Sequence, residues 1–129
     1  MLTDERRTEL NGITEKIIGC CHTVSNSLGI GFLEKVYENA LAIEFEKAGL
    51  QFSRQVAVPV RYEGQLVGDF VADMVVAGAV LVELKAVRAL EEAHFAQCMN
   101  YLKATGLPLC LLVNFGTPHV HVRRIVNDF

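Results

Sequence analysis

The stretch that decides the fold is Val80-Leu-Val-Glu83-Leu-Lys85-Ala-Val87. Apart from Glu83 and Lys85 it is apolar at every position, as expected of a central strand that is covered on both faces. Side chains alternate along a strand, so Glu83 and Lys85 share one face. Burial of such charges is costly unless they are paired or bound to a cation. The strand therefore needs a partner for its charged side.

A second apolar run, over residues 66–76, is interrupted by Asp73. If the two runs form a hairpin with a two-residue loop, Asp73 and Glu83 point to opposite faces. A three-residue loop at 77–79 instead places Asp73 directly opposite Glu83, with β-carbons about 4.5 to 5.5 Å apart. Gly78 can supply the left-handed residue that such loops favour. Because two carboxylates at that separation can share a divalent metal, the metal hypothesis predicts the three-residue register.

The rest of the chain predicts a sheet that carries helices. The first three strands should form an antiparallel meander because hairpin-length turns join them, whereas the fourth follows a helix and can pair in parallel. Apolar periodicity predicts helices over residues 4–27, 32–48 and 90–104, and strands over 55–62, 66–76, 80–87, 109–115 and 120–126.

The length of 129 residues leaves room for one domain, over residues 1–129. Hydrophobic residues make up 51% of the chain and charged residues 21%, so a real core is expected and disorder is not. The formal charge of −3 argues against a polycationic nucleic-acid coat protein. Any contact with nucleic acid must therefore come from a local patch.

The first residues, Met-Leu-Thr-Asp-Glu-Arg-Arg, lack the apolar core expected of a signal peptide, and charges are spaced too closely elsewhere for a membrane-spanning helix. Its four cysteines lack the spacing of a structural zinc site, and adjacent Cys20 and Cys21 are typical of small buried residues in a reducing compartment. We therefore expect a cytoplasmic protein with no membrane partner.

Two helices could bring further groups over the metal. His94, Gln97 and Tyr101 are three and four residues apart and therefore share one helix face. Glu34 and Glu38 do the same on the second helix. Plainer interpretations are a helix–sheet seam for the first set and a solvated helix face for the glutamates, more so for Glu38. The sequence leaves open which of the two glutamates reaches the metal.

The motif Gly31-Phe-Leu-Glu34-Lys-Val-Tyr37 resembles the one that names the GxxExxY family, a branch of the PD-(D/E)XK nuclease superfamily. The resemblance extends over nearly the whole chain. It implies a PD-(D/E)XK nuclease-like αβββαβ core, here with an extra N-terminal helix and a closing C-terminal strand. The further matching segments are Ala72-Asp73, Val82 to Ala86, His94 to Gln97, Asn100 to Lys103, Val113 to Gly116 and Arg124 to Asn127.

The resemblance also implies roles for individual residues. Asp73 and Glu83 would bind Mg²⁺ or Mn²⁺, and Lys85 would be the catalytic lysine. Gln97 and Tyr101 match the Q-x-x-x-Y helix signature of RecB-like nucleases, which implies a catalytic Gln97 and a substrate-binding Tyr101. Glu34 matches the motif glutamate and would be a third metal ligand.

Two positions depart from the family pattern. Ala72 stands where the superfamily name has Pro, and Ser25 stands where this family often has His. If that His assists metal binding, its loss weakens the site, although His22 or His94 could compensate.

These residues predict a metal-dependent nuclease. A metal-activated water positioned by Lys85 would attack the phosphorus of a phosphodiester, while the lysine stabilises the developing charge. The alternative is a non-catalytic nucleic-acid-binding or assembly module that retains the fold, favoured by the acidic balance and small size. DNA or RNA, internal or terminal cleavage, and a homodimer or partner protein that supplies specificity all stay open. The cationic candidates for the phosphate backbone are Arg88 and Lys103, with Arg54, Arg61, Arg123 and Arg124.

Overall fold

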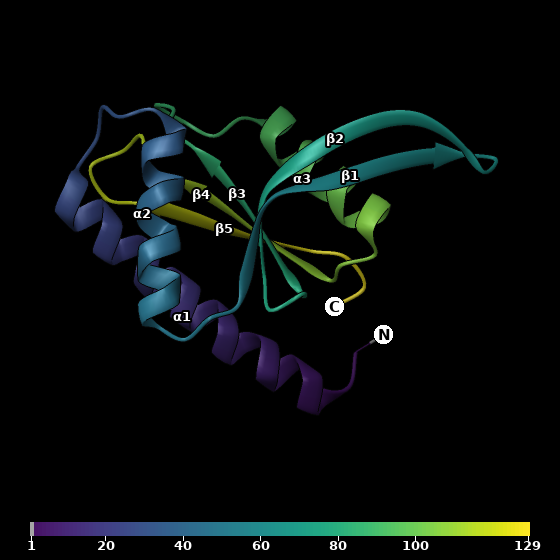
Figure 1. Ribbon diagram of the computed structural model, residues 1–129, viewed down its shortest axis with the longest axis horizontal. Helices are drawn as coiled ribbons and strands as arrows, with labels where there is room; N and C mark the ends of the chain where they lie inside the picture. Colours follow the sequence, from purple (N-terminus) through teal and green to yellow (C-terminus); the bar gives the residue numbers. More distant parts are fainter. Residues whose placement is uncertain (1) are drawn as a thin grey trace.

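The computed structural model describes residues 2–129. They form a five-stranded sheet with α1 and α2 on one face and α3 on the other (Figure 1). The helices are α1 (Asp4–Leu28), α2 (Glu34–Lys47) and α3 (Glu92–Thr105), and the strands are β1 (Phe52–Tyr62), β2 (Gln65–Val76), β3 (Val80–Lys85), β4 (Leu109–Asn114) and β5 (His121–Val126).

The strand order is β1-β2-β3-β4-β5, which makes β3 the central strand and confirms the prediction from its apolar sequence. The pairs β1–β2 and β2–β3 are antiparallel, as the meander predicts. Strand β4 returns through α3 and pairs with β3 in parallel, and β5 closes the sheet antiparallel to β4. The predicted mixed α/β architecture is therefore confirmed.

The sheet separates two hydrophobic clusters. On one side Val80, Val82 and Leu84 of β3 pack in the cluster that α1 and α2 cover. On the other side Leu81 packs in the cluster that α3 covers. Because Glu83 has the parity of Leu81, the alternation directs its side chain to the α3 side.

The loop between β2 and β3 has the predicted three residues, since Val76 pairs with Val80. Gly78 has a φ of 63°, the left-handed conformation predicted for it, and Ala77 shares that conformation with a φ of 54°. The register that the metal hypothesis predicts is therefore the observed one.

Several predicted boundaries are wrong by two or three residues. Strand β1 begins three residues before Gln55, where the prediction began it. Gln55 has a φ of 51°, which interrupts the alternation on which the prediction rests. The apolar face of α2 is narrow, because Ile43 is 60% exposed and Leu33, just before the helix, is 81% exposed.

The β1–β2 hairpin bends at Gln55 and Asp73 and leaves the sheet. Its strands stay paired as far as Tyr62, and Figure 1 shows them extending past α3 as a curved arm. Met74 packs on the α1/α2 side of the sheet, but Ala72, two residues earlier, packs on the α3 side, so the strand twists between them. Within residues 2–129 no helix is long and apolar enough to cross a membrane.

Candidate active site at the fork of the sheet

Asp73 and Glu83 lie where β2 separates from β3. The last paired residues of the two strands are Met74 and Val82. One step further, the main-chain N–H of Asp73 donates to Oε1 of Glu83 over 2.8 Å, and the N–H of Leu84 donates to Oδ2 of Asp73, also over 2.8 Å. The two carboxylates thus take the place of main-chain acceptors and satisfy amides that the separating strands would leave unpaired.

Burial destabilises the charged form of both acids, and nearby negative charge adds to the effect at each of them. Burial, followed by the charge of Asp73, raises the pKa of Glu83 to about 7. Burial also raises the pKa of Asp73, and the charge of Glu38 adds to the effect, although the hydrogen bond from Leu84 opposes it. A cation bound between them would relieve both costs.

Lys85 supplies positive charge at the same site. It follows Glu83 by two residues on β3, and its charge lowers the pKa of both Glu83 and Asp73. Among the described residues it forms no ion pair within 4.0 Å. Its ammonium is therefore near the acids without being bound to either of them.

Asn114 fixes the chain just after Lys85, and the sequence analysis assigned it no role. Its Oδ1 accepts hydrogen bonds from the N–H groups of Val87 and Gly116, each over 3.0 Å, and its Nδ2 donates to the carbonyl of Val87 over 2.9 Å. A Cβ on Gly116 would lie 2.2 Å from that carbonyl, so only glycine fits. In the sequence, this residue could have been recognised as an amide at the end of an apolar run, and the structure shows that it is fully buried.

Helix α3 brings Gln97 and Tyr101 to the site but not His94. Gln97 Nε2 donates to Tyr101 Oη over 3.2 Å. Tyr101 packs in the same cluster as Ala72, the residue before Asp73, and burial and then the charges of Glu83 and Asp73 raise its pKa. His94 Nδ1 instead accepts from the N–H at the start of α3 and caps that helix.

The two glutamates of α2 lie in different environments. Glu34 is exposed in the first turn, and its charge contributes to the raised pKa of Glu83. Glu38 is only 3% exposed, so a solvated face is wrong for it. Its carboxylate accepts from Arg54 Nε over 2.8 Å and Gln55 Nε2 over 2.7 Å, and it pairs with Lys35. Glu38 therefore fastens α2 to the bend in β1.

Tyr37 belongs to the core. Its hydroxyl donates to the carbonyl of Gly29 over 2.7 Å, and its ring stacks on Phe115 with centroids 4.5 Å apart. Ser25, at the position where histidine was expected from the family pattern, is buried on α1, whereas His22 is exposed.

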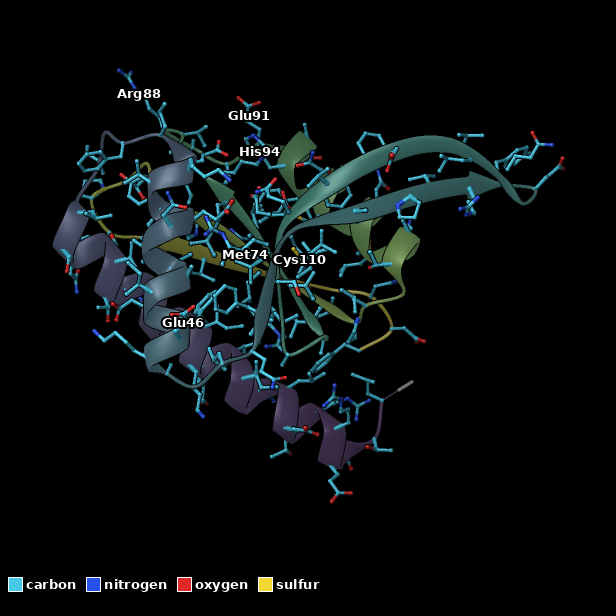
Figure 2. The ribbon with its side chains drawn as sticks, in the orientation of Figure 1. Glu46, Met74, Arg88, Glu91, His94 and Cys110 are labelled. Carbon is cyan, nitrogen blue, oxygen red and sulfur yellow. The ribbon has the colours of Figure 1, made fainter. Side chains whose placement is uncertain are left out.

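The cationic candidates are spread over the surface. Arg88 is exposed between β3 and α3, and Figure 2 shows it at the edge of the molecule, pointing outward. Lys103 lies near the other end of α3, where it shares a groove with Arg61. Arg123 and Arg124 have structural partners instead, because their guanidinium groups lie over the rings of Phe95 and Phe129 respectively.

The donors at the fork fit a hard divalent cation. Mg²⁺ is typically held by one or two carboxylates and keeps several waters. Asp73 Oδ1 and Glu83 Oε2 are not used in the hydrogen bonds to the main chain and are available as ligands. Within residues 2–129 no group of three His, Cys, Asp or Glu side chains gathers closely enough to hold a metal ion, so Glu34 does not join the pair in this conformation.

Comparisons with known proteins agree with this arrangement. The fold is similar to an alkaline exonuclease, LHK-Exo, from Laribacter hongkongensis, with a TM-score of 0.54 and 15% identity over 73% of this chain and 56% of the exonuclease. It is also similar to the protein SSO0001, with a TM-score of 0.56 and 15% identity over 96% of this chain and 62% of that protein.

This chain thus spans less than two thirds of each of those proteins. A search of curated protein sequences gives no significant match. The family model described as "PD-(D/E)XK nuclease superfamily" matches residues 11–125, which include both acids and the lysine of the fork. The chain therefore belongs to the PD-(D/E)XK nuclease superfamily.

Proposed function

We propose that the protein is a metal-dependent nuclease whose active site is the fork between β2 and β3. The observation that carries the proposal is the position of Asp73 and Glu83 beside each other, with Lys85 near them. The carboxylate of each acid accepts a hydrogen bond from a main-chain amide of the opposite strand. A structural role alone does not explain two adjacent buried acids, because an isolated buried charge is costly. Superfamily membership and the exonuclease fold neighbour support the same activity.

In this proposal Asp73 and Glu83 would hold Mg²⁺ or Mn²⁺, and Glu34 would become a third ligand only after its side chain moves toward them from the first turn of α2. The cation supplies a Lewis acid for the phosphoryl oxygens and lowers the pKa of a nearby water. Lys85 stabilises negative charge that develops on the phosphodiester. Gln97 and Tyr101 orient the substrate from α3, with their mutual hydrogen bond fixing both side chains.

We also assign the chain to the GxxExxY branch on the segment Gly31 to Tyr37, and to the cytoplasm on its cysteines. All four are free and buried, which suits a reducing compartment. Specificity would come from a second copy or a partner protein, while Arg88 and Lys103 contact the phosphate backbone.

The test is cleavage of labelled single- and double-stranded DNA and RNA over a titration of Mg²⁺ or Mn²⁺. We expect wild type to cleave, and Asp73→Asn and Lys85→Ala to lose at least about a hundred-fold in rate, as removal of a charge-stabilising group does elsewhere. Asp69→Asn is the matched control, because Asp69 lies on the same strand but is exposed on the arm. Equal rates in all four proteins, or no cleavage by any of them, would exclude the proposal and favour a binding module that retains the fold.

A further inference from the structure

A groove runs between the β1–β2 arm and α3. Its wider lobe has a volume of about 630 Å³ and reaches Arg61 and Lys103. Its narrower lobe has a volume of about 300 Å³ and reaches Gln97 and Tyr101. The lobes are continuous, because Val60, Phe70 and Asn100 line both of them.

The narrow end of the groove opens beside the proposed active site. Tyr101 lines this end and packs in the same hydrophobic cluster as Ala72, the residue before Asp73. Gln97, which donates to the Tyr101 hydroxyl, lines it as well. A molecule in the groove would therefore end close to the strand segment that carries Asp73.

An exposed aromatic ring forms part of the groove wall. Phe70 is 48% exposed, and its ring centroid lies 6.0 Å from that of Tyr101. The ring leans over Gly68, where a Cβ would lie only 3.1 Å from it. Glycine at this position therefore lets the ring lie close to the strand. An exposed aromatic side chain of this kind is a stacking surface for a nucleobase.

Two cations face the groove from opposite sides. Arg61 comes from β1 and Lys103 from α3. A register shift between Val60 and Arg61 allows both of these consecutive residues to line the groove. Within residues 2–129, neither cation takes part in an ion pair that would neutralise it. Both are therefore available for phosphate groups.

We propose that this groove binds a single strand of nucleic acid and guides it to the fork, an inference that rests on the proposed nuclease function. The combination of an apolar, aromatic wall with flanking cations is how proteins bind unpaired strands, whose bases stack while the cations follow the backbone. A duplex hides the faces of its bases and would leave Phe70 and Val60 without a partner.

The experiment measures binding of labelled oligothymidylate, oligouridylate and a DNA duplex by fluorescence anisotropy, in EDTA so that cleavage does not interfere. Phe70→Ala should weaken binding of the single strand by roughly five- to a hundred-fold, the range for loss of one stacked base, with little effect on the duplex. Val71→Ala is the matched control, because Val71 is the next residue on β2, is 52% exposed and lies outside the groove. It should bind as wild type does.

The roles of Arg61 and Lys103 are tested separately, through the salt dependence of strand binding. For the single strand, the double variant Arg61→Ala, Lys103→Ala should make the negative slope of log affinity against log salt shallower by about 1.4, because each lost phosphate contact removes about 0.7 from its magnitude. Lys16→Ala, which removes an exposed lysine of α1, should leave the slope unchanged. Thermal melting of each variant checks that it is folded.

The outcomes separate this inference from the proposed function. Loss of strand binding in folded Phe70→Ala, with binding retained in Val71→Ala, supports the groove even if wild type cleaves nothing. Equal strand binding by wild type and Phe70→Ala overturns the groove even if wild type cleaves. Tighter binding of duplex than of single strand, or no binding of any oligonucleotide, overturns it too. The ratio of oligothymidylate to oligouridylate affinity then tells which nucleic acid the groove prefers.

Discussion

The main-chain amide of Asp73 donates to the carboxylate of Glu83 over 2.8 Å, and the amide that follows Glu83 donates to the carboxylate of Asp73 over the same distance. Two acids that repel each other are thereby held side by side by the backbone between them. The arrangement maintains a site whose metal-free form is electrostatically unfavourable, so changes that impair function should improve stability.

Glu83→Gln should therefore stabilise the metal-free protein. The amide oxygen can still accept from Asp73, while the repulsion and the burial of charge are removed. We expect the free energy of unfolding at pH 8 in EDTA to rise by about 1 to 3 kcal/mol, up to the size of the pKa shift, as measured by urea denaturation. Asp69→Asn, which changes an exposed acid of the same strand, should leave it unchanged. A less stable Glu83→Gln would contradict the electrostatic account.

The stability of the metal-free protein should also fall as the pH rises. Between pH 4.5, the ordinary pKa of a glutamate, and about 7, folded Glu83 keeps a proton that the unfolded chain has released. Rising pH therefore favours the unfolded chain over that window, by about 3 kcal/mol in total. Denaturation at a series of pH values should show this decline in wild type and a smaller one in Glu83→Gln. Parallel pH profiles would show that Glu83 does not titrate as proposed.

Metal should reverse that loss. Because the cation binds the ionised acids, Mn²⁺ at a hundred times its dissociation constant should stabilise wild type at pH 8 by about 2.7 kcal/mol. Differential scanning fluorimetry should show that Mn²⁺ raises the melting temperature of wild type and does not change that of Asp73→Asn.

Glu34→Gln should require more Mn²⁺ for the same rise in melting temperature. An unchanged Mn²⁺ titration would remove Glu34 from the ligand set.

Glu38 should matter for the stability of the fold. Glu38→Gln removes the charge that Arg54 and Lys35 pair with, and should lower the free energy of unfolding by about 1 to 3 kcal/mol. Glu34→Gln, on the same helix but exposed, should change it by less than about 0.5 kcal/mol. Urea denaturation of both variants gives the comparison. The result would be contradicted if Glu34→Gln were the more destabilising change.

Asn114→Ala should disturb the position of Lys85 as well as stability. It leaves the N–H and carbonyl of Val87 and the N–H of Gly116 without their partner, at a cost of about 1 to 3 kcal/mol for each group that water cannot reach. Denaturation should show that loss, and the cleavage rate of the fraction still folded should fall. Asn26→Ala, at an exposed position of α1, is the control for both measurements. An unchanged rate would mean that Asn114 does not position the lysine.

The sheet and its central pair of acids could be predicted because both follow from local periodicity. The alternation around Asp73 and Glu83 leaves two loop lengths open, and the requirement that the two acids share a metal selects the loop of three residues. Glu38 was assigned wrongly because helical periodicity does not tell which neighbouring element covers a face. Its partners come from the bend in β1, and no glycine or proline marks that bend, which occurs at Gln55.

The groove beside Phe70 depends on the same bend and was missed for the same reason. Asn114 is a different case, because a polar residue in the apolar strand β4 was visible in the sequence. The rule applied to Asp73 and Glu83 would have found it.

The three-residue loop after β2 also has a genetic consequence. Loss or gain of one codon between Val76 and Val80 would turn one acid away from the other without changing any residue of the fork. Most such single-residue deletions in surface loops are tolerated, whereas this one should leave a strand pair that still forms but a site that does not. The length of that loop is therefore under stronger constraint than the identity of its residues. Mutant libraries built on this chain should vary the residues of the loop and keep its length.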